Sequence, residues 1–230
     1  MPRNLPRRAS RSAALLALAG CLQAAGAGPI AHENIGAELV AKASIRQDGS
    51  FQSGLRFTDK AGEHLLVLTA KDSPSRKGSD RDRIDSHQLT AGLYRLEGSS
   101  WKREWQIRDG VVCPDLDSEA VFLLAGLTVT DLDDDQLAEV TVPYRKFCGG
   151  GVDTKDLKVV LRSGPLKFAL RGQSKLLIPG QAPLGGEHQQ DAALAQPQYR
   201  SFRDHLEQVW LQVSPEKLGD PVTAEKSPAH

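Results

Sequence analysis

An acidic run in the middle of the chain carries the clearest chemical signal. Asp131, Asp133 and Asp135 alternate along it and take positions 1, 3 and 5 of a loop of oxygen ligands. The backbone carbonyl of Leu137 would be position 7, and the carboxylate of Glu139 would be position 9. Hard cations such as Ca²⁺ take about six to eight oxygen ligands, and alternate residues of a tight loop can direct several oxygens to one point. The spacing therefore predicts a calcium site at these five residues.

This run departs from the helix–loop–helix calcium motif. Position 6 is Gln136, where the turn prefers glycine, and position 12 is Val142 rather than glutamate. Glycine adopts a positive φ at little cost, whereas glutamine does not. An acidic turn without an ion therefore stays open as the alternative.

The chain contains three cysteines, and two of them are expected to pair. Cys21 belongs to the N-terminal segment discussed below, which leaves Cys113 and Cys148. Two cysteines in an oxidising compartment usually form a disulfide, and no histidine lies near enough in sequence to favour a metal site. Cys113 precedes the strand that enters the acidic run, and Cys148 ends the strand that leaves it. If these strands are hairpin partners, their far ends meet, and the prediction is a Cys113–Cys148 disulfide.

Recognisable catalytic motifs are missing from the sequence. The six histidines are scattered, no G-x-S-x-G elbow is present, and no glycine-rich phosphate loop precedes a helix. The carboxylates of Asp115, Asp117 and Glu119 could serve a glycosidase, but spacing in sequence does not give separation in space. The expected function is therefore non-enzymatic binding or scaffolding, and a carbohydrate-active enzyme or polysaccharide assembly factor is the alternative.

Residues 1–20 have the pattern of an export signal. Four arginines precede the short apolar run 13–20, which is far below the roughly 20 apolar residues that span a bilayer. The run ends in Leu18-Ala19-Gly20-Cys21, a lipobox in which Cys21 would be acylated and would anchor the mature chain to a membrane. The competing cleavage site, Ala25-Gly26-Ala27, would release a soluble protein. The lipobox is the favoured prediction. Either cleavage site predicts an exported protein, which would be a membrane-anchored lipoprotein in the first case and a soluble periplasmic protein in the second.

The charge of the mature chain excludes two classes of partner. The full chain has 29 basic and 29 acidic residues. Removal of the four arginines of the signal leaves 25 basic residues and a net charge of −4. A mildly acidic chain lacks the basic surface of a nucleic-acid-binding protein, and it lacks the polybasic patch that binds anionic lipid.

The body of the chain reads as a mainly β structure. Short alternating apolar runs separated by turn residues fill residues 36–175, which favours antiparallel meanders. Thr58-Asp59, followed by a run from Leu65, resembles Thr130-Asp131, followed by a run from Val140. This faint repeat indicates two blade-like units, and a coincidence between two hairpins stays open as the alternative. Two blades cannot close a ring, so we expect a sandwich or two-sheet stack.

The flanking segments have other patterns. A tether is expected over 21–35, a linker over 176–198 and a disordered tail over 214–230. Between the last two, a helical stripe predicts an amphipathic helix over 199–213 that packs on the β domain. The stripe consists of Phe202, Leu206, Val209, Trp210 and Val213.

Short motifs carry a resemblance to a known family. The stretch 127–172 includes Thr130-Asp131-Leu132-Asp133-Asp134-Asp135, Glu139-Val140-Thr141-Val142-Pro143-Tyr144 and Cys148. With Cys113-Pro114-Asp115 and the helix around Trp210, it resembles an uncharacterised family of exported bacterial proteins, over roughly residues 50–213. Some members are labelled surface polysaccharide biosynthesis proteins, which implies partners in the cell envelope, either protein or polysaccharide. The acidic run also resembles the calcium-holding loops of FG-GAP-type propeller repeats.

Overall fold

The structure is a computed structural model, and it describes residues 28–73 and 84–217. The predicted signal segment 1–20, Cys21 and most of the predicted tail therefore lie outside the described residues. Among the helices that are described, none combines the length and the apolar character needed to cross a membrane.

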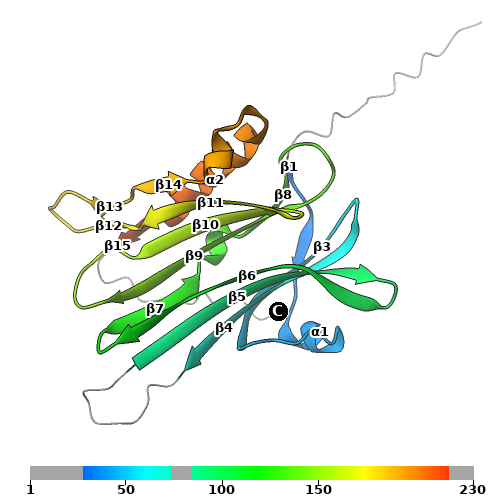
Figure 1. The fold of residues 1–230 in the computed structure, drawn as a ribbon, viewed down its shortest axis with the longest axis horizontal. Coiled ribbons are helices and arrows are strands. Elements are labelled where there is room, and N and C mark those ends of the chain that lie inside the picture. Colours follow the sequence, from blue (N-terminus) through cyan, green and yellow to red (C-terminus); the bar gives the residue numbers. More distant parts are fainter. Residues whose placement is uncertain (1–27, 74–83, 218–230) are drawn as a thin grey trace, which may run out of the picture.

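The first half of the chain forms a five-stranded antiparallel sheet with the strand order β2-β3-β4-β5-β6. Consecutive strands are neighbours throughout, so β3 to β6 form a simple meander (Figure 1). The strands are β2 (His32–Asn34), β3 (Ser50–Asp59), β4 (Gly62–Ser73), β5 (Ile84–Glu97) and β6 (Ser100–Pro114).

The second half, together with the N-terminal strand β1, forms a seven-stranded antiparallel sheet with the order β1-β8-β9-β10-β11-β14, in which β7 also pairs with β9. Its strands are β1 (Gly28–Pro29), β7 (Asp117–Phe122), β8 (Thr128–Asp131), β9 (Glu139–Gly149), β10 (Asp156–Ser163), β11 (Leu166–Gln173) and β14 (His188–Gln190). A small third sheet contains β12 (Lys175–Leu177), β13 (Leu184–Gly185) and β15 (Pro215–Lys217), in which β12 and β15 are parallel.

The two large sheets pack face to face and enclose the main core. Alternate residues of a strand point to opposite faces, so each sheet contributes one set of apolar side chains. Leu66, Leu68 and Leu93 of the five-stranded sheet meet Val140 and Val142 of the seven-stranded sheet, and all five are buried.

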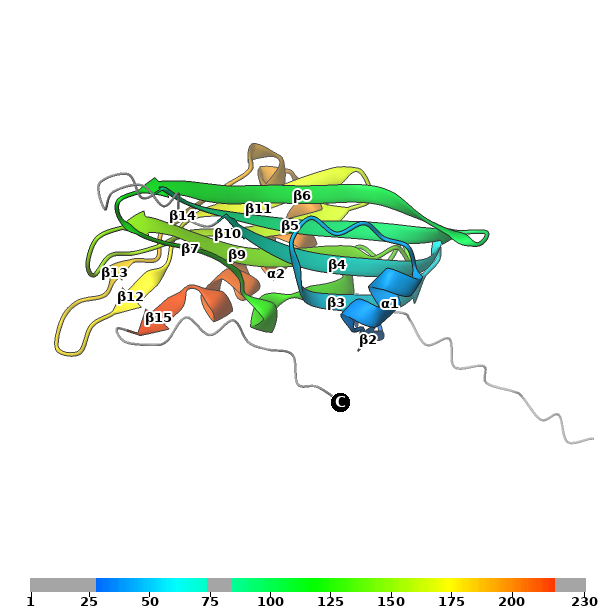
Figure 2. The same cartoon turned by 90° about the horizontal axis from the view of Figure 1, so that it is seen from below.

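Each large sheet is covered on its outer face by a helix (Figures 1 and 2). Helix α1 (Ala37–Lys42) buries Val40 against Leu65 and Val67 of β4. Helix α2 (Arg200–Val213) covers β10 and β11 with the predicted stripe, of which Phe202, Leu206, Val209 and Trp210 are buried. Three 3₁₀ helices, Leu124–Gly126, Ala192–Ala195 and Pro197–Tyr199, complete the helical structure of the described residues.

The predicted fold class is confirmed, including the two meanders and the C-terminal helix. Strands β3 to β6 form one meander and β8 to β11 form the other. The repeated Thr-Asp motif has the same place in both: Thr58 pairs with Glu63 across β3 and β4, and Thr130 pairs with Glu139 across β8 and β9. The short helix α1 was not predicted.

Three stretches expected to lack regular structure carry some, and in one of them, the predicted tail 214–230, residues 215–217 form β15, which pairs with β12. Residues 28–34 of the predicted tether include β1 and β2, which extend the edges of the two large sheets. Residues 176–198 of the predicted linker include β13, β14 and two 3₁₀ helices, and β14 pairs with β11. Their polar composition suits sheet edges, where side chains face solvent.

Candidate functional site

Three acidic side chains converge where a loop connects the end of β8 to the start of β9. Asp131 ends β8, Glu139 begins β9, and Asp133 lies in the loop between them. One carboxylate oxygen of each residue lies within 4.8 Å of the others. The antiparallel pairing of Thr130 with Glu139 produces this approach, because it brings the two strand ends together.

Glu139 is the most unusual member of the cluster because it is fully buried, at 0% exposure. Its Oε2 accepts a hydrogen bond from the backbone N–H of Leu132 at 2.7 Å, whereas Oε1 is buried without a hydrogen-bond partner among the described residues. Burial raises the pKa of Glu139 to about 7, and repulsion from Asp133 acts in the same direction. A buried carboxylate with a free oxygen requires a proton or a cation as its partner.

The carboxylates of Asp131 and Asp133 also lack basic partners among the described side chains. Asp131 has a buried Oδ1 that accepts no hydrogen bond within the described ranges. Burial and the charges of Asp135 and Asp131 raise the pKa of Asp133. Within residues 28–73 and 84–217, none of the three cluster carboxylates forms an ion pair with a basic side chain. The cluster therefore concentrates negative charge that the described side chains do not balance.

The loop around the cluster takes the conformation that its sequence disfavours. Asp134 and Gln136 both have positive φ, at 63° and 69°. The N–H of Gln136 donates to Oδ2 of Asp131 at 3.1 Å, which orients that carboxylate. Gln136 thus adopts the left-handed conformation that glycine takes at the lowest cost.

The structure brings together three of the four predicted carboxylates. Asp131, Asp133 and Glu139 form the cluster, whereas Asp135 lies outside it. Oδ1 of Asp135 accepts the N–H of Leu137 at 2.7 Å and so closes the turn instead. The cluster can hold a metal ion through oxygen ligands, since nitrogen and sulfur ligands are missing from it.

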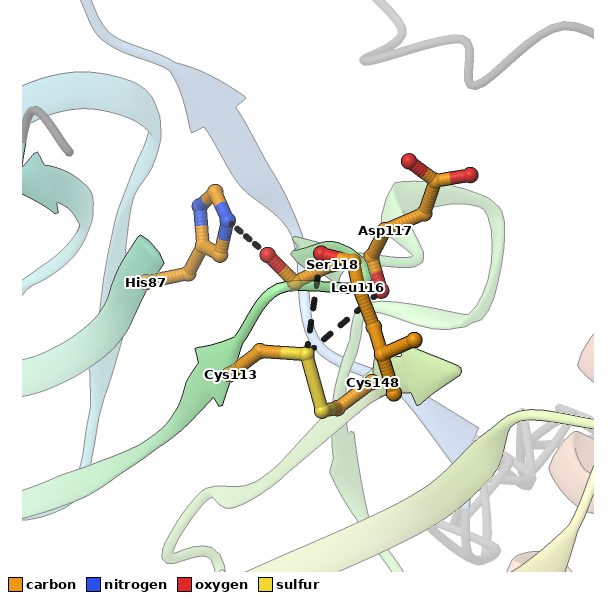
Figure 3. The surroundings of a disulfide bond; sticks show 6 residues. All are labelled: His87, Cys113, Leu116, Asp117, Ser118 and Cys148. Carbon is orange, nitrogen blue, oxygen red and sulfur yellow. Dashed lines mark hydrogen bonds between the residues drawn. A yellow bond between two sulfur atoms is a disulfide. The ribbon is translucent and has the colours of Figure 1, made fainter. Parts of the chain in front are cut away.

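The second predicted site, the Cys113–Cys148 disulfide, is present (Figure 3). The two Cα atoms are 5.5 Å apart, within the usual range. Its position differs from the expected hairpin, because Cys113 ends β6 of the five-stranded sheet and Cys148 lies on β9 of the seven-stranded sheet. The strand opposite Cys148 is β7, where Ser118 is its partner. The disulfide therefore joins the two sheets.

Two contacts at the disulfide are packing contacts. Sγ of Cys113 lies 3.8 Å from the carbonyl oxygen of Leu116 and 3.7 Å from that of Asp117. A disulfide-bonded sulfur carries no hydrogen, so these contacts are not hydrogen bonds. They place the turn between β6 and β7 directly over the bridge.

A chain of three polar side chains beside the disulfide was not predicted. Nδ1 of His87 lies 2.7 Å from Oδ1 of Asp72, and Nε2 lies 2.9 Å from Oγ of Ser118. Asp72 and His87 are cross-strand partners on β4 and β5. Ser118 comes from β7 of the other sheet, and Figure 3 shows its contact with His87. This connectivity is that of an Asp-His-Ser triad. Only the docking of the two sheets brings these residues together, so their spacing in sequence carried no signal.

Comparisons of the chain with protein-family models, with curated proteins and with solved structures give no match. The site is therefore interpreted from its own geometry.

Proposed function

We propose that this chain is an exported, lipid-anchored protein of the bacterial cell envelope that acts by binding, and that its acidic cluster holds Ca²⁺. The observation that carries the calcium assignment is the buried carboxylate of Glu139, which has one unpartnered oxygen and one oxygen within 4.8 Å of oxygens of Asp131 and Asp133. A divalent cation would balance charge that burial makes costly.

Calcium suits this cluster better than the other common divalent ions. All its side-chain ligands are carboxylates, which disfavours zinc and copper. Magnesium demands a near-ideal octahedron and keeps several waters, whereas calcium accepts irregular oxygen sets. The exposed side of Asp133 leaves room for water ligands to complete the shell.

Thermal unfolding tests the calcium assignment. Calcium at millimolar concentration should raise the melting temperature by mass action, and magnesium should raise it less. Asp133→Asn should abolish the rise. Asp134→Asn is the matched control, because it removes the same charge from the neighbouring loop residue and asparagine tolerates positive φ. An equal calcium response in both variants would contradict the assignment.

Export and anchoring both rest on the N-terminal segment, and the disulfide supports export. A bridge between two sheets forms and persists in an oxidising compartment. Strand β1 begins at Gly28, seven residues after Cys21, so an acylated Cys21 would hold the seven-stranded sheet within about 25 Å of the membrane. Multiple acyl chains at that cysteine would give stable anchoring.

Processing of the chain in a bacterial host tests the anchor. Globomycin or Cys21→Ser should block maturation, and mass spectrometry should find an acylated Cys21 at the mature N-terminus. A soluble product that begins at Gly28 would instead establish cleavage after Ala27 and remove the lipid anchor from the proposal.

The His87 chain favours a second candidate function, a carbohydrate-active enzyme of the ester-hydrolysing type. His87 would act as the general base for Ser118, and Asp72 would orient the imidazole. This candidate ranks second because the Asp72 side chain is 72% exposed, whereas the aspartate of a serine triad is buried. Labelling by a fluorophosphonate that is lost in Ser118→Ala would support it, and the absence of labelling would exclude a reactive Ser118.

A further inference from the structure

A polar groove of about 340 Å³ lies on the outer face of the five-stranded sheet, far in sequence from the acidic cluster. One wall is the connection between α1 and β3, and the floor is formed by β4, β5 and β6. The lining side chains are mostly cationic or hydrogen-bonding. They include Arg46, Gln47, Asp48, Thr90, Tyr94, Arg103, Gln106 and Arg108.

Strand pairing arranges the floor in cross-strand rows. Thr90 pairs with Arg108, and Tyr94 pairs with Arg103, on β5 and β6. Gly92 lies between these rows and contributes no side chain. A Cβ there would lie 3.0 Å from a ring carbon of Tyr94, so the aromatic ring leans over the glycine. The floor therefore presents a flat ring between two arginines.

Asp48 fixes the wall of the groove to the floor. Its carboxylate accepts hydrogen bonds from Arg108 at 2.8 Å and from Lys71 at 3.1 Å. Its backbone carbonyl accepts the hydroxyl of Thr69 at 3.1 Å. The loop that carries Arg46 is thus held in place without a ligand, and the one acidic side chain of the lining is already neutralised.

Three groups of the lining have no partner within the described part of the chain. The guanidinium groups of Arg46 and Arg103 form neither an ion pair nor a hydrogen bond there. Thr90 is only 7% exposed, and its Oγ1 is buried with no hydrogen-bond partner. Because Leu89 and Ala91 point into the core between the sheets, Thr90 points to the groove side. Two free guanidinium groups and a buried free hydroxyl indicate a ligand that brings acceptor oxygens.

The composition of the groove distinguishes between classes of anion. A bare inorganic anion would occupy a small part of 340 Å³, a volume within the range of small-molecule sites. Phosphate sites commonly use helix N-termini or glycine-rich loops, whereas this floor consists of strand side chains. Arginine pairs with carboxylates, glutamine and threonine bond hydroxyl groups, and a tyrosine ring offers an apolar face to a sugar ring.

We propose that this groove binds an acidic saccharide, with its carboxylates on Arg46 and Arg103 and a sugar ring against Tyr94. The inference deepens the binding role proposed above and rests on it, but it concerns a site separate from the acidic cluster.

Isothermal titration with di-galacturonate tests the inference, in calcium-free buffer because uronates bind calcium themselves. Cellobiose is the neutral probe of the same size, and inorganic phosphate is the simple anion. We expect binding of di-galacturonate that is at least tenfold tighter than that of either other probe. Arg103→Gln should weaken it at least tenfold. Lys102→Gln, which removes the same charge from the adjacent residue outside the groove lining, should change it less than twofold.

Several outcomes would overturn the inference. These are no binding of di-galacturonate at 10 mM, binding no tighter than that of cellobiose or phosphate, and equal effects of the Arg103→Gln and Lys102→Gln variants. Circular dichroism of both variants controls for folding. If di-galacturonate does not bind as expected, a calcium-induced rise in melting temperature in the same preparation would show that the groove proposal has failed and the metal-site proposal has not.

Discussion

The carboxylate of Asp59, at the end of β3, accepts a hydrogen bond from the backbone N–H of Ala138 at 3.0 Å. Asp59 belongs to one meander, and Ala138 immediately precedes β9 of the other. The neighbouring N–H of Lys60 donates to the carbonyl of Gln136 at 2.9 Å. The β3–β4 turn therefore supports the acidic loop from the opposite sheet.

Loss of the Asp59 carboxylate should loosen the acidic loop. Asp59 also bonds Nε2 of the buried His64 at 2.9 Å, so Asp59→Ala would leave two buried groups unsatisfied. We expect a loss of about 2 kcal/mol in the free energy of unfolding. Asp59→Asn keeps an acceptor oxygen and should lose less. Urea denaturation measures both variants, and an equal loss would show that the acceptor for Ala138 is unimportant.

The strands and the paired acidic residues were accessible from sequence because both follow from local pattern. Period-two alternation marks the strands, and an antiparallel turn brings the ends of its two strands together. The orientation of Asp135 was not accessible, because its carboxylate could either join the cluster or close the turn at Leu137. Asp59 supports the loop only because the two sheets dock against each other, and a local sequence pattern cannot predict how two sheets dock.

The cysteines illustrate the same limit. Counting them, together with the prediction of export, was enough to pair Cys113 with Cys148. The expected hairpin between their strands was wrong, since β6 and β9 belong to different sheets. Likewise, the groove depends on Gly92 and on the pairing of β5 with β6, whose register could not be read from composition.

Removal of the disulfide should destabilise the contact between the sheets. The cysteines are 35 residues apart, and the chain-entropy model gives about 4 kcal/mol for a loop of this length. Urea denaturation of the double variant Cys113→Ala/Cys148→Ala should show a loss of this order. The reduced wild-type protein provides the comparison, and a loss below about 1 kcal/mol in both would contradict a stabilising role.

Asp109 forms a second link between the sheets. It lies on β6 and bonds Lys146 at 2.9 Å, Lys158 at 2.5 Å and the hydroxyl of Tyr144 at 2.9 Å. Burial opposes ionisation, but the hydrogen bonds from the two lysines outweigh it and hold the pKa of Asp109 well below its usual range.

Asp109→Asn should therefore cost about 3 kcal/mol near pH 7, because it leaves two partly buried lysines without their partner. A lowered pKa means that the stabilisation is present above about pH 4 and is lost as the pH falls further. Urea titrations at pH 7 and pH 3 should show a difference from the wild type that is smaller at pH 3 but still present, because the folded-state pKa lies well below the usual range. A difference that is independent of pH would contradict an electrostatic origin.

Gln136→Gly should stabilise the acidic loop. Gln136 has a φ of 69°, which is costly for a residue with a Cβ, and its contacts to Asp131 and Lys60 use only the backbone. Relief of this cost should raise the free energy of unfolding by about 1 kcal/mol and strengthen calcium binding. Gln136→Ala keeps the Cβ and should give no gain. A stability of Gln136→Gly below that of the wild type would mean that glycine's entropy in the unfolded chain outweighs the relief.

Glu139 should make the calcium-free protein less stable as the pH rises. Its pKa is raised to about 7 by burial, against an ordinary value of 4.5. The folded state therefore holds a proton that the unfolded state releases, and the stabilisation present below about pH 4.5 is lost as the pH rises through 7. A shift of this size corresponds to about 3 kcal/mol.

In EDTA, Glu139→Gln should match the wild type at pH 4.5 and exceed its stability by about 3 kcal/mol at pH 8, because glutamine resembles the protonated acid. The difference between the two proteins cancels other titrating groups, such as His205, whose pKa is lowered by burial. With calcium at pH 8 the wild type should instead be more stable than Glu139→Gln, because the metal replaces the proton on the wild-type carboxylate and glutamine carries no charge to bind it. Urea denaturation of both proteins at the two pH values, with and without calcium, measures these differences. A wild type that is more stable than Glu139→Gln at pH 8 in EDTA would contradict the buried, proton-holding carboxylate.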